Sequence, residues 1–347
     1  MNIHSLKGAL NMQKNDLVLV TGITGYMATW LAQDLLQRGY RVRGTYRSTS
    51  KLPRIKQLLP GIELVPADLN GDAGWAAALK NVQWLFHVAS PQAVATESHR
   101  TDTAIKGIDN IFKVALASPT LQKIVLTSSE AAIAYGNQGK TVYTENDWTN
   151  AAAPGLADYM KSKTLEEHRA WQLINDPQRN PRQIAMTAIN PSFVLGPSLV
   201  PWARYSAQQI KQLLRVPFNI PMQGYAVDVR DVAQMQMALM QQPAANGTRN
   251  LAIGMPMSMA ELKHFVLTDF HAQGLRGWQL PFPTGLLRPF QRNTTVGDFY
   301  PRLKGQVTYQ PLHPAFYQPQ FTDLRQSLRA MVTQLLRDGL IGRKQNA

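Results

Sequence analysis

The stretch that decides the fold lies near the N-terminus and reads Asp16-Leu17-Val18-Leu19-Val20-Thr21-Gly22-Ile23-Thr24-Gly25-Tyr26-Met27-Ala28. Its apolar run ends in a glycine-rich turn, and an amphipathic stretch from Met27 to Arg38 follows, closed by Gly39. This order predicts a strand, a tight loop, a helix and a glycine that ends the helix. Gly22 suits the turn, Gly25 lets the backbone approach a pyrophosphate, and Ala28 lets the helix pack close to the strand. The stretch therefore predicts a dinucleotide-binding site.

Further segments of strand length recur along the chain, and helical patterns separate most of them. They are Arg41 to Tyr46, Ile62 to Pro66, Trp84 to Val88, Lys123 to Thr127 and Ile184 to Ile189. The last is expected to end at Asn190-Pro191, because proline cannot donate to a sheet. Strands that alternate with helices predict an α/β fold with a doubly wound parallel sheet, covered on both faces.

The sequence pattern becomes irregular after Gly196-Pro197. Pro, Trp, Tyr and Phe stand at irregular positions from Pro201 to Tyr225 and from Trp278 to Phe321, where we expect loops and short elements. Helical patterns occupy Tyr159 to Asn175, Val229 to Gln241, Ser258 to His271 and Thr322 to Asp338. We expect a flexible extension (1–15), a dinucleotide-binding domain (16–197) and a smaller substrate lobe (198–347) with elements that return to the first domain.

Composition excludes several classes of protein. The 347 residues include no cysteine, which excludes disulfide scaffolds, thiolate metal sites and cysteine nucleophiles, and no metal site is expected. No apolar run approaches the roughly 18 residues of a membrane helix, and the N-terminus lacks the pattern of a signal peptide. We expect a soluble cytoplasmic protein without a membrane partner.

The net charge of +14 is unusual, and a basic run between Gln37 and Ile62 contributes to it without an acidic residue: Arg38, Arg41, Arg43, Arg47, Lys51, Arg54 and Lys56. The remaining excess is scattered, which favours a solvated surface over a nucleic-acid partner. NAD sites place Asp or Glu after the second strand, whereas Arg47 stands there in this chain. A guanidinium suits the 2'-phosphate of NADP(H), with Arg54 or Lys51 assisting, although a solvated basic edge would have the same sequence.

Candidate catalytic residues stand at two places. Ser128 and Ser129 follow the strand that ends at Thr127, while Tyr159 and Lys163 lie one helical turn apart. Carbonyl reduction needs a proton donor, and a tyrosine, with an ordinary pKa of about 10, needs a nearby cation to serve at neutral pH. A serine hydroxyl can hold the same oxygen. Tyr300 and Lys304 repeat the spacing around Pro301 in an irregular region, and we interpret that copy as accidental.

Two other strand ends carry polar groups. Asp68 and Leu69 follow the third strand, where a carboxylate can reach the adenine side, and Val88-Ala89-Ser90 follow the fourth, on the nicotinamide side. His87 precedes the end of that strand and is interpreted as a packed residue rather than a catalyst.

These motifs together resemble the extended short-chain dehydrogenases/reductases of the NAD-dependent epimerase/dehydratase superfamily, and among them the dihydroflavonol reductase-like branch of NADPH-dependent aldehyde and ketone reductases. The resemblance covers about residues 15–255, while residues 274–321 are essentially unmatched. Besides the Thr-Gly-x-x-Gly-x-x-Ala loop, it rests on Val42 to Arg47, Phe86 to Pro91, Leu126 to Ser129, Tyr143 to Glu145 with Trp148, Ser162 to Thr164, and Asn190-Pro191 with Val194, Gly196 and Pro197.

The resemblance implies reduction of a carbonyl by hydride from the B face of NADPH. Tyr159 would protonate the carbonyl oxygen, Lys163 would also bind the nicotinamide ribose, and Ser129 would be the catalytic serine, with Ser128 as the alternative. Arg47 would bind the phosphate, the backbone from Pro191 to Val194 would hold the carboxamide, and Asn110 would support a proton relay. The expected cofactor-binding residues are Gly22, Thr24, Gly25, Tyr26, Met27, Arg47, Arg54, Asp68, Leu69, Val88, Ala89, Ser90, Tyr159, Lys163, Pro191 and Val194.

Other functions compete with this interpretation. A nucleotide-sugar epimerase or dehydratase shares the site residues, but such enzymes usually carry a tyrosine four residues after the serine, where this chain has Ile133, and Tyr135 comes too late. A hydroxysteroid dehydrogenase-like enzyme would use the same residues for the reverse reaction, the oxidation of an alcohol. From a different class, the chain could be a non-catalytic dinucleotide sensor or a nucleic-acid-binding module, although sensors of this superfamily typically lack the Tyr-Lys pair that is present here.

The expected partner is a small carbonyl compound, and the enzyme is expected to be a monomer or homodimer. Eight aromatic residues permit an apolar or aromatic pocket, or ordinary core packing of the smaller lobe: Trp202, Tyr205, Trp278, Phe282, Phe290, Phe299, Tyr300 and Phe316.

Overall fold

The computed structural model describes residues 12–91, 100–202, 205–290, 294–313, 316 and 321–342. Most of the expected N-terminal extension, residues 1–11, lies outside the described residues.

A seven-stranded sheet forms the centre of the molecule, in the order β11-β7-β5-β4-β1-β2-β3. All neighbouring strands are parallel. The strands are β1 (Leu17–Val20), β2 (Arg41–Tyr46), β3 (Glu63–Pro66), β4 (Trp84–His87), β5 (Lys123–Thr127), β7 (Ala185–Pro191) and β11 (Arg249–Ala252). The order reverses beside β1, as in dinucleotide-binding folds, so the doubly wound fold expected from the sequence is confirmed.

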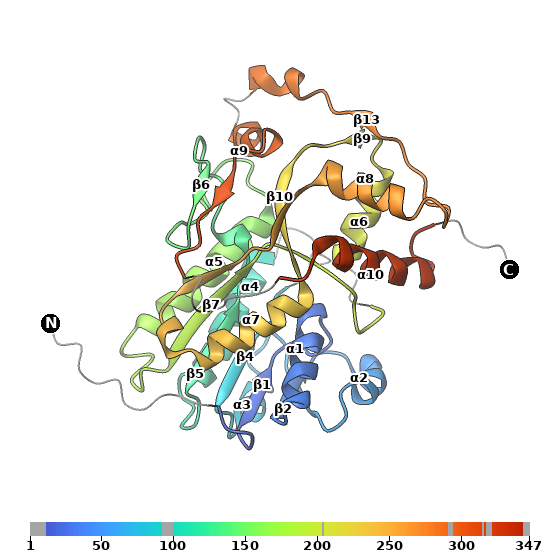
Figure 1. Cartoon of the computed structure of the whole chain (residues 1–347). Helices are drawn as coiled ribbons and strands as arrows, with labels where there is room; N and C mark the ends of the chain where they lie inside the picture. The colour runs from blue at the N-terminus through green and yellow to red at the C-terminus, as the bar shows by residue number, and fades with distance from the viewer. Residues whose placement is uncertain are drawn as a thin grey trace.

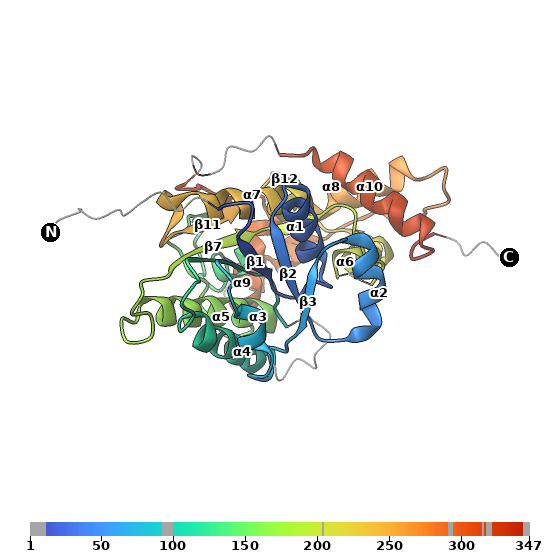
Figure 2. The ribbon, with the colours of Figure 1, turned by 90° about the horizontal axis from the view of Figure 1, so that it is seen from below.

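Helices cover both faces of this sheet, and Figure 2 shows the three layers. One face packs against α1 (Tyr26–Gln37) and α7 (Val229–Gln241), and the other against α3 (Trp75–Leu79), α4 (Arg100–Ala115) and α5 (Asp158–Asn175). Successive side chains of a strand point to opposite faces. Accordingly, Val18 and Val20 belong to the core on the α1 side, whereas Leu17 and Leu19 belong to the core on the α4 side. The short α2 (Leu52–Leu58) follows β2, after a single 3-10 turn at Thr49–Lys51.

A second, smaller group of elements lies over the upper right of the molecule in Figure 1. A three-stranded sheet, β12-β10-β8, is built from β8 (Phe193–Leu195), β10 (Gln223–Asp228) and β12 (Met255–Ser258). Its apolar core is shared with α6 (Tyr205–Arg215), α8 (Met259–Asp269) and α10 (Leu324–Arg337).

Two short parallel pairs and a helix complete this region. β9 (Phe218–Asn219) pairs with β13 (Leu280–Pro281), and β6 (Val142–Tyr143) pairs with β14 (Thr308–Tyr309). Helix α9 (Thr294–Leu303) precedes β14, and 3-10 turns lie at Glu130–Ala132, Pro243–Ala245 and Thr284–Phe290.

β7 ends at Pro191, as expected, although Pro191 itself still pairs with Ala252 and the Ser192 N–H donates to the Ala252 carbonyl at 3.0 Å. One local prediction was wrong. The segments expected to be irregular contain α6, β10 and α9. In α6, Ala207 and Ile210 lie at helical spacing and are buried in the core of the smaller group of elements, although prolines flank the segment.

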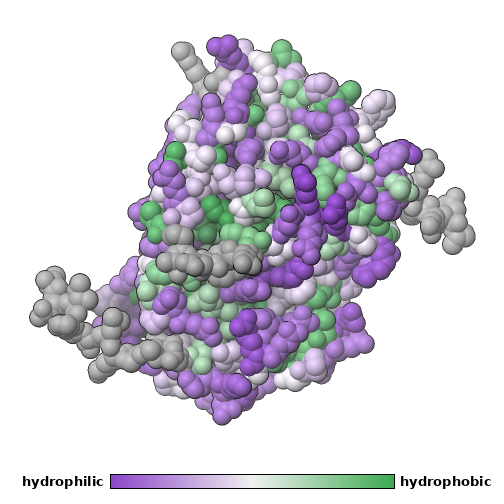
Figure 3. All heavy atoms as spheres, in the orientation of Figure 1, coloured by the Kyte–Doolittle hydropathy of each residue, from purple (hydrophilic) through white to green (hydrophobic). Residues whose placement is uncertain are grey.

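Two observations concern the surface. Within the described ranges, no helix combines the length and the apolar character needed to cross a membrane. Figure 3 shows hydrophilic side chains over much of one face, with smaller hydrophobic areas between them.

Candidate active site

The glycine-rich loop between β1 and α1 has the backbone that its sequence requires. Gly22 has a positive φ of 68°, and a Cβ added there would lie 3.0 Å from the Cβ of Ala89. Gly25 precedes α1, and no side chain caps the helix, so its first N–H groups have no side-chain acceptor at this end. Such a helix start binds anions readily, and this loop therefore fits a pyrophosphate.

The loop is locked to the end of β4 through Thr21. The Thr21 hydroxyl accepts hydrogen bonds from the N–H groups of Val88 (3.0 Å) and Ala89 (2.9 Å) and lies 2.9 Å from Nδ1 of His87. Because two N–H groups occupy its lone pairs, the hydroxyl donates to Nδ1, which leaves His87 neutral. Burial, and secondarily the charge of Lys163, lower the pKa of His87 to about 3. His87 is therefore a packed strand residue, as expected.

The remaining loop residues contact the segment that follows β8. The Trp202 indole donates to the Thr24 carbonyl at 2.8 Å, and the Tyr26 hydroxyl donates to the Gly196 carbonyl at 2.6 Å. Met27 packs against the apolar core on the α1 side. The side chains of Tyr26 and Met27 thus stabilise the loop. If either residue binds the cofactor, it would do so through its backbone N–H group.

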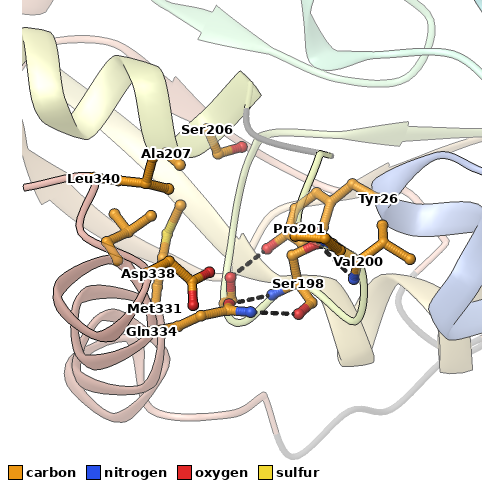
Figure 4. A pocket seen from close by; sticks show the side chains of 12 residues that line it. Tyr26, Ser198, Val200, Pro201, Ser206, Ala207, Met331, Gln334, Asp338 and Leu340 are labelled. Carbon is orange, nitrogen blue, oxygen red and sulfur yellow. Dashed lines mark hydrogen bonds between the residues drawn. The ribbon is translucent and has the colours of Figure 1, made fainter. Parts of the chain in front are cut away.

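A small cavity lies beside Tyr26, between the segment after β8 and the end of α10 (Figure 4). Ser198 and Gln334 close one side, because the Ser198 N–H donates to the Gln334 amide oxygen and the Gln334 amide donates back to the Ser198 carbonyl. Its volume of about 20 Å³ accommodates about one water molecule, so it is not a substrate site.

Acidic residues from elsewhere neutralise part of the basic run that the sequence shows without interruption. Arg38 pairs with Asp34, and both Arg41 and Arg43 pair with Glu63. Arg54 donates to Gln57 at 2.7 Å, and the Lys51 ammonium lies over the Trp202 ring, 5.3 Å from its centroid.

Arg47 differs from these neighbours. It lies at the end of β2, is exposed, and has no acidic partner within the described part of the chain. The structure therefore leaves Arg47 available for an anion, as the sequence predicts, while Arg54 is partly engaged.

The turn after β3 is supported from α4. The Asp68 carboxylate accepts a hydrogen bond from the Asn70 N–H at 3.0 Å, and the Asn110 amide donates to the Leu69 carbonyl at 2.8 Å. No described contact connects Asn110 with Lys163. Asn110 thus holds the turn at Asp68 and Leu69, and the proton relay suggested for it has no support in these contacts.

Ser129, Tyr159 and Lys163 are brought together at the carboxyl end of β5. The Tyr159 hydroxyl donates to Ser129 Oγ at 3.4 Å, and Ser129 Oγ also accepts the Ala131 N–H at 3.1 Å. The Lys163 side chain is buried, and its Nζ lies 3.5 Å from the Thr127 carbonyl oxygen. Two hydroxyl groups and an ammonium group therefore converge where the sequence predicts the catalytic centre.

Ser128 points to a different environment. Its hydroxyl donates a 2.5 Å hydrogen bond to the Glu167 carboxylate, which also accepts from Asn190 at 2.8 Å and from Trp171 at 3.1 Å. Arg249 completes the set with an ion pair of 2.7 Å to the same carboxylate. Ser128 therefore belongs to a buried structural network, and its geometry does not support it as the alternative to Ser129.

The network around Glu167 was missed by sequence reasoning. Burial raises the pKa of Glu167, but the charge of Arg249 and hydrogen bonds from Arg249, Ser128 and Trp171 lower it below its ordinary value. The Arg249 guanidinium stacks on Trp148, 3.6 Å from the ring centroid, and Trp148 stacks on His168. The available signal was a glutamate one helical turn after Lys163, but Arg249 lies 82 residues further along the chain.

The residues expected to hold the carboxamide lie in two sheets. Pro191 is the last residue of β7, and Val194 pairs with Val227 in the smaller sheet. The Ser192 N–H between them is already bonded to Ala252. The backbone contact with a carboxamide stays a prediction.

The second Tyr-Lys copy lies in and just after α9. The Lys304 ammonium is 5.8 Å from the centroid of the Tyr300 ring, and no described contact joins either residue to Ser129. The aromatic residues of this region are spread out: Trp278 and Phe290 are exposed, and Phe282 packs edge-on against Phe218. They do not mark a single pocket.

Comparisons with known proteins agree with this geometry. Residues 18–254 match the model of the NAD dependent epimerase/dehydratase family. The chain is 32% identical over 247 residues to a cinnamoyl-CoA reductase from Medicago truncatula, covering 67% of this chain and 74% of that protein. It is 28% identical over 253 residues to a dihydroflavonol 4-reductase from Arabidopsis thaliana, covering 68% of this chain and 65% of that protein.

A solved structure shows the same fold. Yeast methylglyoxal/isovaleraldehyde reductase Gre2, complexed with NADPH, matches with a TM-score of 0.76 and 22% identity, over 94% of this chain and all of that one. The fold and the oxidoreductase class expected from the sequence are confirmed, and the expected nicotinamide cofactor agrees with the family. The chain belongs to the NAD dependent epimerase/dehydratase family, within the reductases related to dihydroflavonol reductase.

Proposed function

We propose that this protein reduces a small aldehyde or ketone to an alcohol with NADPH, and that Tyr159 is the proton donor. The observation that carries the proposal is the convergence of the Ser129 and Tyr159 hydroxyl groups, 3.4 Å apart, near the buried Lys163. This cluster lies beyond the carboxyl ends of the strands, where open parallel sheets bind their ligands.

The residues around the glycine-rich loop fit the cofactor. Gly22 has the positive φ that the tight turn requires, the uncapped start of α1 suits the pyrophosphate, and Arg47 offers a guanidinium to the 2'-phosphate. NADPH, when bound, supplies the hydride that reduces the carbonyl carbon.

The protein's own part in the reaction is to hold and protonate the oxygen. Ser129, fixed by the Ala131 N–H, and Tyr159 would both donate hydrogen bonds to the carbonyl oxygen. As negative charge develops there, Tyr159 transfers its proton. The Lys163 ammonium stabilises the tyrosinate that remains and would also bind the nicotinamide ribose.

The names of the relatives support a carbonyl substrate. A cinnamoyl-CoA reductase and a methylglyoxal/isovaleraldehyde reductase are named for substrates that carry a thioester or an aldehyde group. We extend that class of substrate to this chain.

The epimerase alternative is less consistent with the site. Ile133, the position at which an epimerase usually carries a tyrosine, is fully buried. The Tyr135 hydroxyl donates to the Glu130 carboxylate at 3.3 Å. Neither residue is placed to take over the role of that tyrosine.

A panel assay tests the proposal. Consumption of NADPH and of NADH would be followed with isovaleraldehyde, methylglyoxal, cinnamaldehyde and simple ketones. Tyr159→Phe should lower kcat by at least about a hundredfold while NADPH binding stays within about twofold of wild type, because only the proton donor is removed.

The matched control is Tyr300→Phe, which removes a hydroxyl from the second Tyr-Lys copy and should leave turnover unchanged. Turnover that survives in Tyr159→Phe, or is lost in Tyr300→Phe, would contradict the assignment. Failure of the wild type on the whole panel, together with salt-sensitive retention on DNA, would favour the nucleic-acid-binding alternative.

A further inference from the structure

The face of α5 that carries Tyr159 and Lys163 also carries a carboxylate that the proposed reaction does not use. Glu166 Oε2 accepts a 2.9 Å hydrogen bond from the Lys163 ammonium, and the two side chains are only 5% and 7% exposed. The Ser90 hydroxyl donates to the same oxygen at 3.3 Å. Within the described part of the chain, Lys163 and Ser90 are the hydrogen-bond partners of the Glu166 side chain.

The neighbouring glutamate shows what is unusual about Glu166. Glu167 binds Ser128, Asn190 and Arg249, groups that hold β5, β7 and β11 together. Glu166 instead contacts Lys163 and Ser90, both of which are expected at the cofactor. A buried carboxylate is costly unless it is paired, so the role of Glu166 is tied to the charge of Lys163.

The charges around Lys163 determine the protonation of the Lys163–Glu166 pair. The titratable groups that face it come from three elements: Tyr159, Glu166 and Glu167 from α5, His87 from β4 and, behind Glu167, Arg249 from β11. Burial lowers the pKa of Lys163, but the Glu166 charge and then Tyr159 raise it above its ordinary value. Burial in turn raises the pKa of Glu166. Lys163 is therefore held in its charged form, paired with the Glu166 carboxylate.

We propose that Glu166 is a positioning residue that holds the Lys163 ammonium and offsets part of its charge, and so sets the pH range in which Tyr159 gives up its proton. The inference rests on the proposed function of Tyr159. In the reduction the O–H bond of Tyr159 breaks and a new O–H bond forms on the former carbonyl oxygen, while the carbonyl carbon receives the hydride of NADPH. Glu166 acts on the tyrosinate that remains, through Lys163.

Glu166→Gln removes the charge and keeps the size of the side chain. The Lys163 charge, no longer offset, would then stabilise the tyrosinate more strongly. The basic limb of the pH profile for reduction, and the acidic limb for oxidation of the alcohol, should both move to lower pH by about one unit. Asp109→Asn is the matched control. Asp109 of α4 pairs with Arg169 of α5 at a half-exposed site, and this variant should leave both limbs of the pH profiles in place.

The main readouts are kcat against pH with isovaleraldehyde and NADPH, and with the corresponding alcohol and NADP+. A second readout needs no substrate: the ultraviolet absorbance of tyrosinate is titrated in wild type and in Glu166→Gln, each compared with its own Tyr159→Phe partner. The difference attributable to Tyr159 should appear at lower pH in Glu166→Gln. A merely structural role for Glu166 would change thermal stability without moving this titration.

The outcomes separate the two proposals. Full turnover in Tyr159→Phe overturns the proposed function, whereas an inactive Tyr159→Phe with unchanged pH limbs and titration in Glu166→Gln overturns the inference about Glu166 alone. If Glu166→Gln does not fold, Glu166→Asp takes its place, because it moves the carboxylate away from Lys163 and should give a smaller shift in the same direction. An unshifted profile in Glu166→Asp would then overturn the inference.

Discussion

The Ser128 hydroxyl donates a 2.5 Å hydrogen bond to the buried Glu167 carboxylate. Its neighbour Ser129 shares a hydrogen bond with the Tyr159 hydroxyl instead. The two adjacent hydroxyl groups therefore contact different residues of α5, Ser128 in the network around Glu167 and Ser129 in the candidate catalytic centre. Two residues that the sequence presents as alternatives thus have separate contacts.

This separation predicts opposite phenotypes for the two alanine variants. Ser129→Ala should lower kcat by about a hundredfold, the usual cost of losing a donor to a developing oxyanion, with a smaller fall in Tm than Ser128→Ala, because Ser129 only caps the short turn at Glu130–Ala132. Ser128→Ala leaves the buried Glu167 without one donor and should destabilise the fold by about 1–3 kcal/mol, while kcat falls much less. Steady-state kinetics and thermal unfolding of both variants check this, and the reverse pattern would assign catalysis to Ser128.

Glu167 makes the free energy of unfolding depend on pH in the acidic range. Burial raises its pKa, but the charge and hydrogen bonds of Arg249 lower it more, so the pKa in the folded state lies below the ordinary 4.5. A lowered folded-state pKa contributes stability that is fully present above about pH 4.5 and is lost as the pH falls through the folded value. Glu167→Gln should lower the free energy of unfolding by about 3–5 kcal/mol at pH 7, and the difference from wild type should shrink below pH 4.5.

Urea unfolding at several pH values measures both effects. The matched control is Glu63→Gln, because Glu63 pairs with Arg41 and Arg43 at a site where its side chain is 40% exposed. Exposed pairs contribute about 0–1 kcal/mol. A loss as large in Glu63→Gln as in Glu167→Gln would show that burial is not the cause.

Arg47 is expected to determine the choice between the two nicotinamide cofactors. Arg47→Asp should lower the ratio of kcat/KM for NADPH to that for NADH by about a hundredfold, because a charge-assisted contact worth roughly 1.5–3 kcal/mol is replaced by repulsion of the 2'-phosphate. Lys56→Asp makes the same change of charge at an exposed position of α2 and should leave the ratio near its wild-type value. An unaltered ratio in Arg47→Asp would assign the phosphate to another basic residue.

The basic run illustrates what the sequence can and cannot predict. The strand, loop and helix from Leu17 to Gln37 follow from local patterns, and so does the position of Arg47 at the end of β2. That Glu63 neutralises Arg41 and Arg43 depends instead on the pairing of β2 with β3. A local pattern carries no information on such partners.

The candidate site divides in the same way. The positions of Ser128, Ser129, Tyr159 and Lys163, after a strand and in a helix, are readable from the chain, and the resemblance to the reductase family selects Ser129 as the catalytic serine. Arg249 was not predicted, because its contact with Glu167 joins residues 82 positions apart through the order of the strands. The substrate is not predicted in detail, since the residues beyond Pro197 include aromatic side chains without a pattern that identifies a pocket.

Gly44 offers the last prediction, on the contact between β2 and the glycine-rich loop. A Cβ at Gly44 would lie 2.7 Å from Cβ and Cγ1 of Ile23, a distance that real Cβ atoms do not show, and Ile23 is fully buried. Gly44→Ala should therefore push the loop away from β2, destabilise the fold by about 1–3 kcal/mol, and weaken NADPH binding severalfold. Gly71→Ala is the matched control, because a Cβ there meets nothing within 4 Å. Thermal unfolding and NADPH titration of both variants measure the effect. If Gly44→Ala bound NADPH as tightly as Gly71→Ala despite a lower Tm, the loop would be rigid enough to bind the cofactor without support from β2.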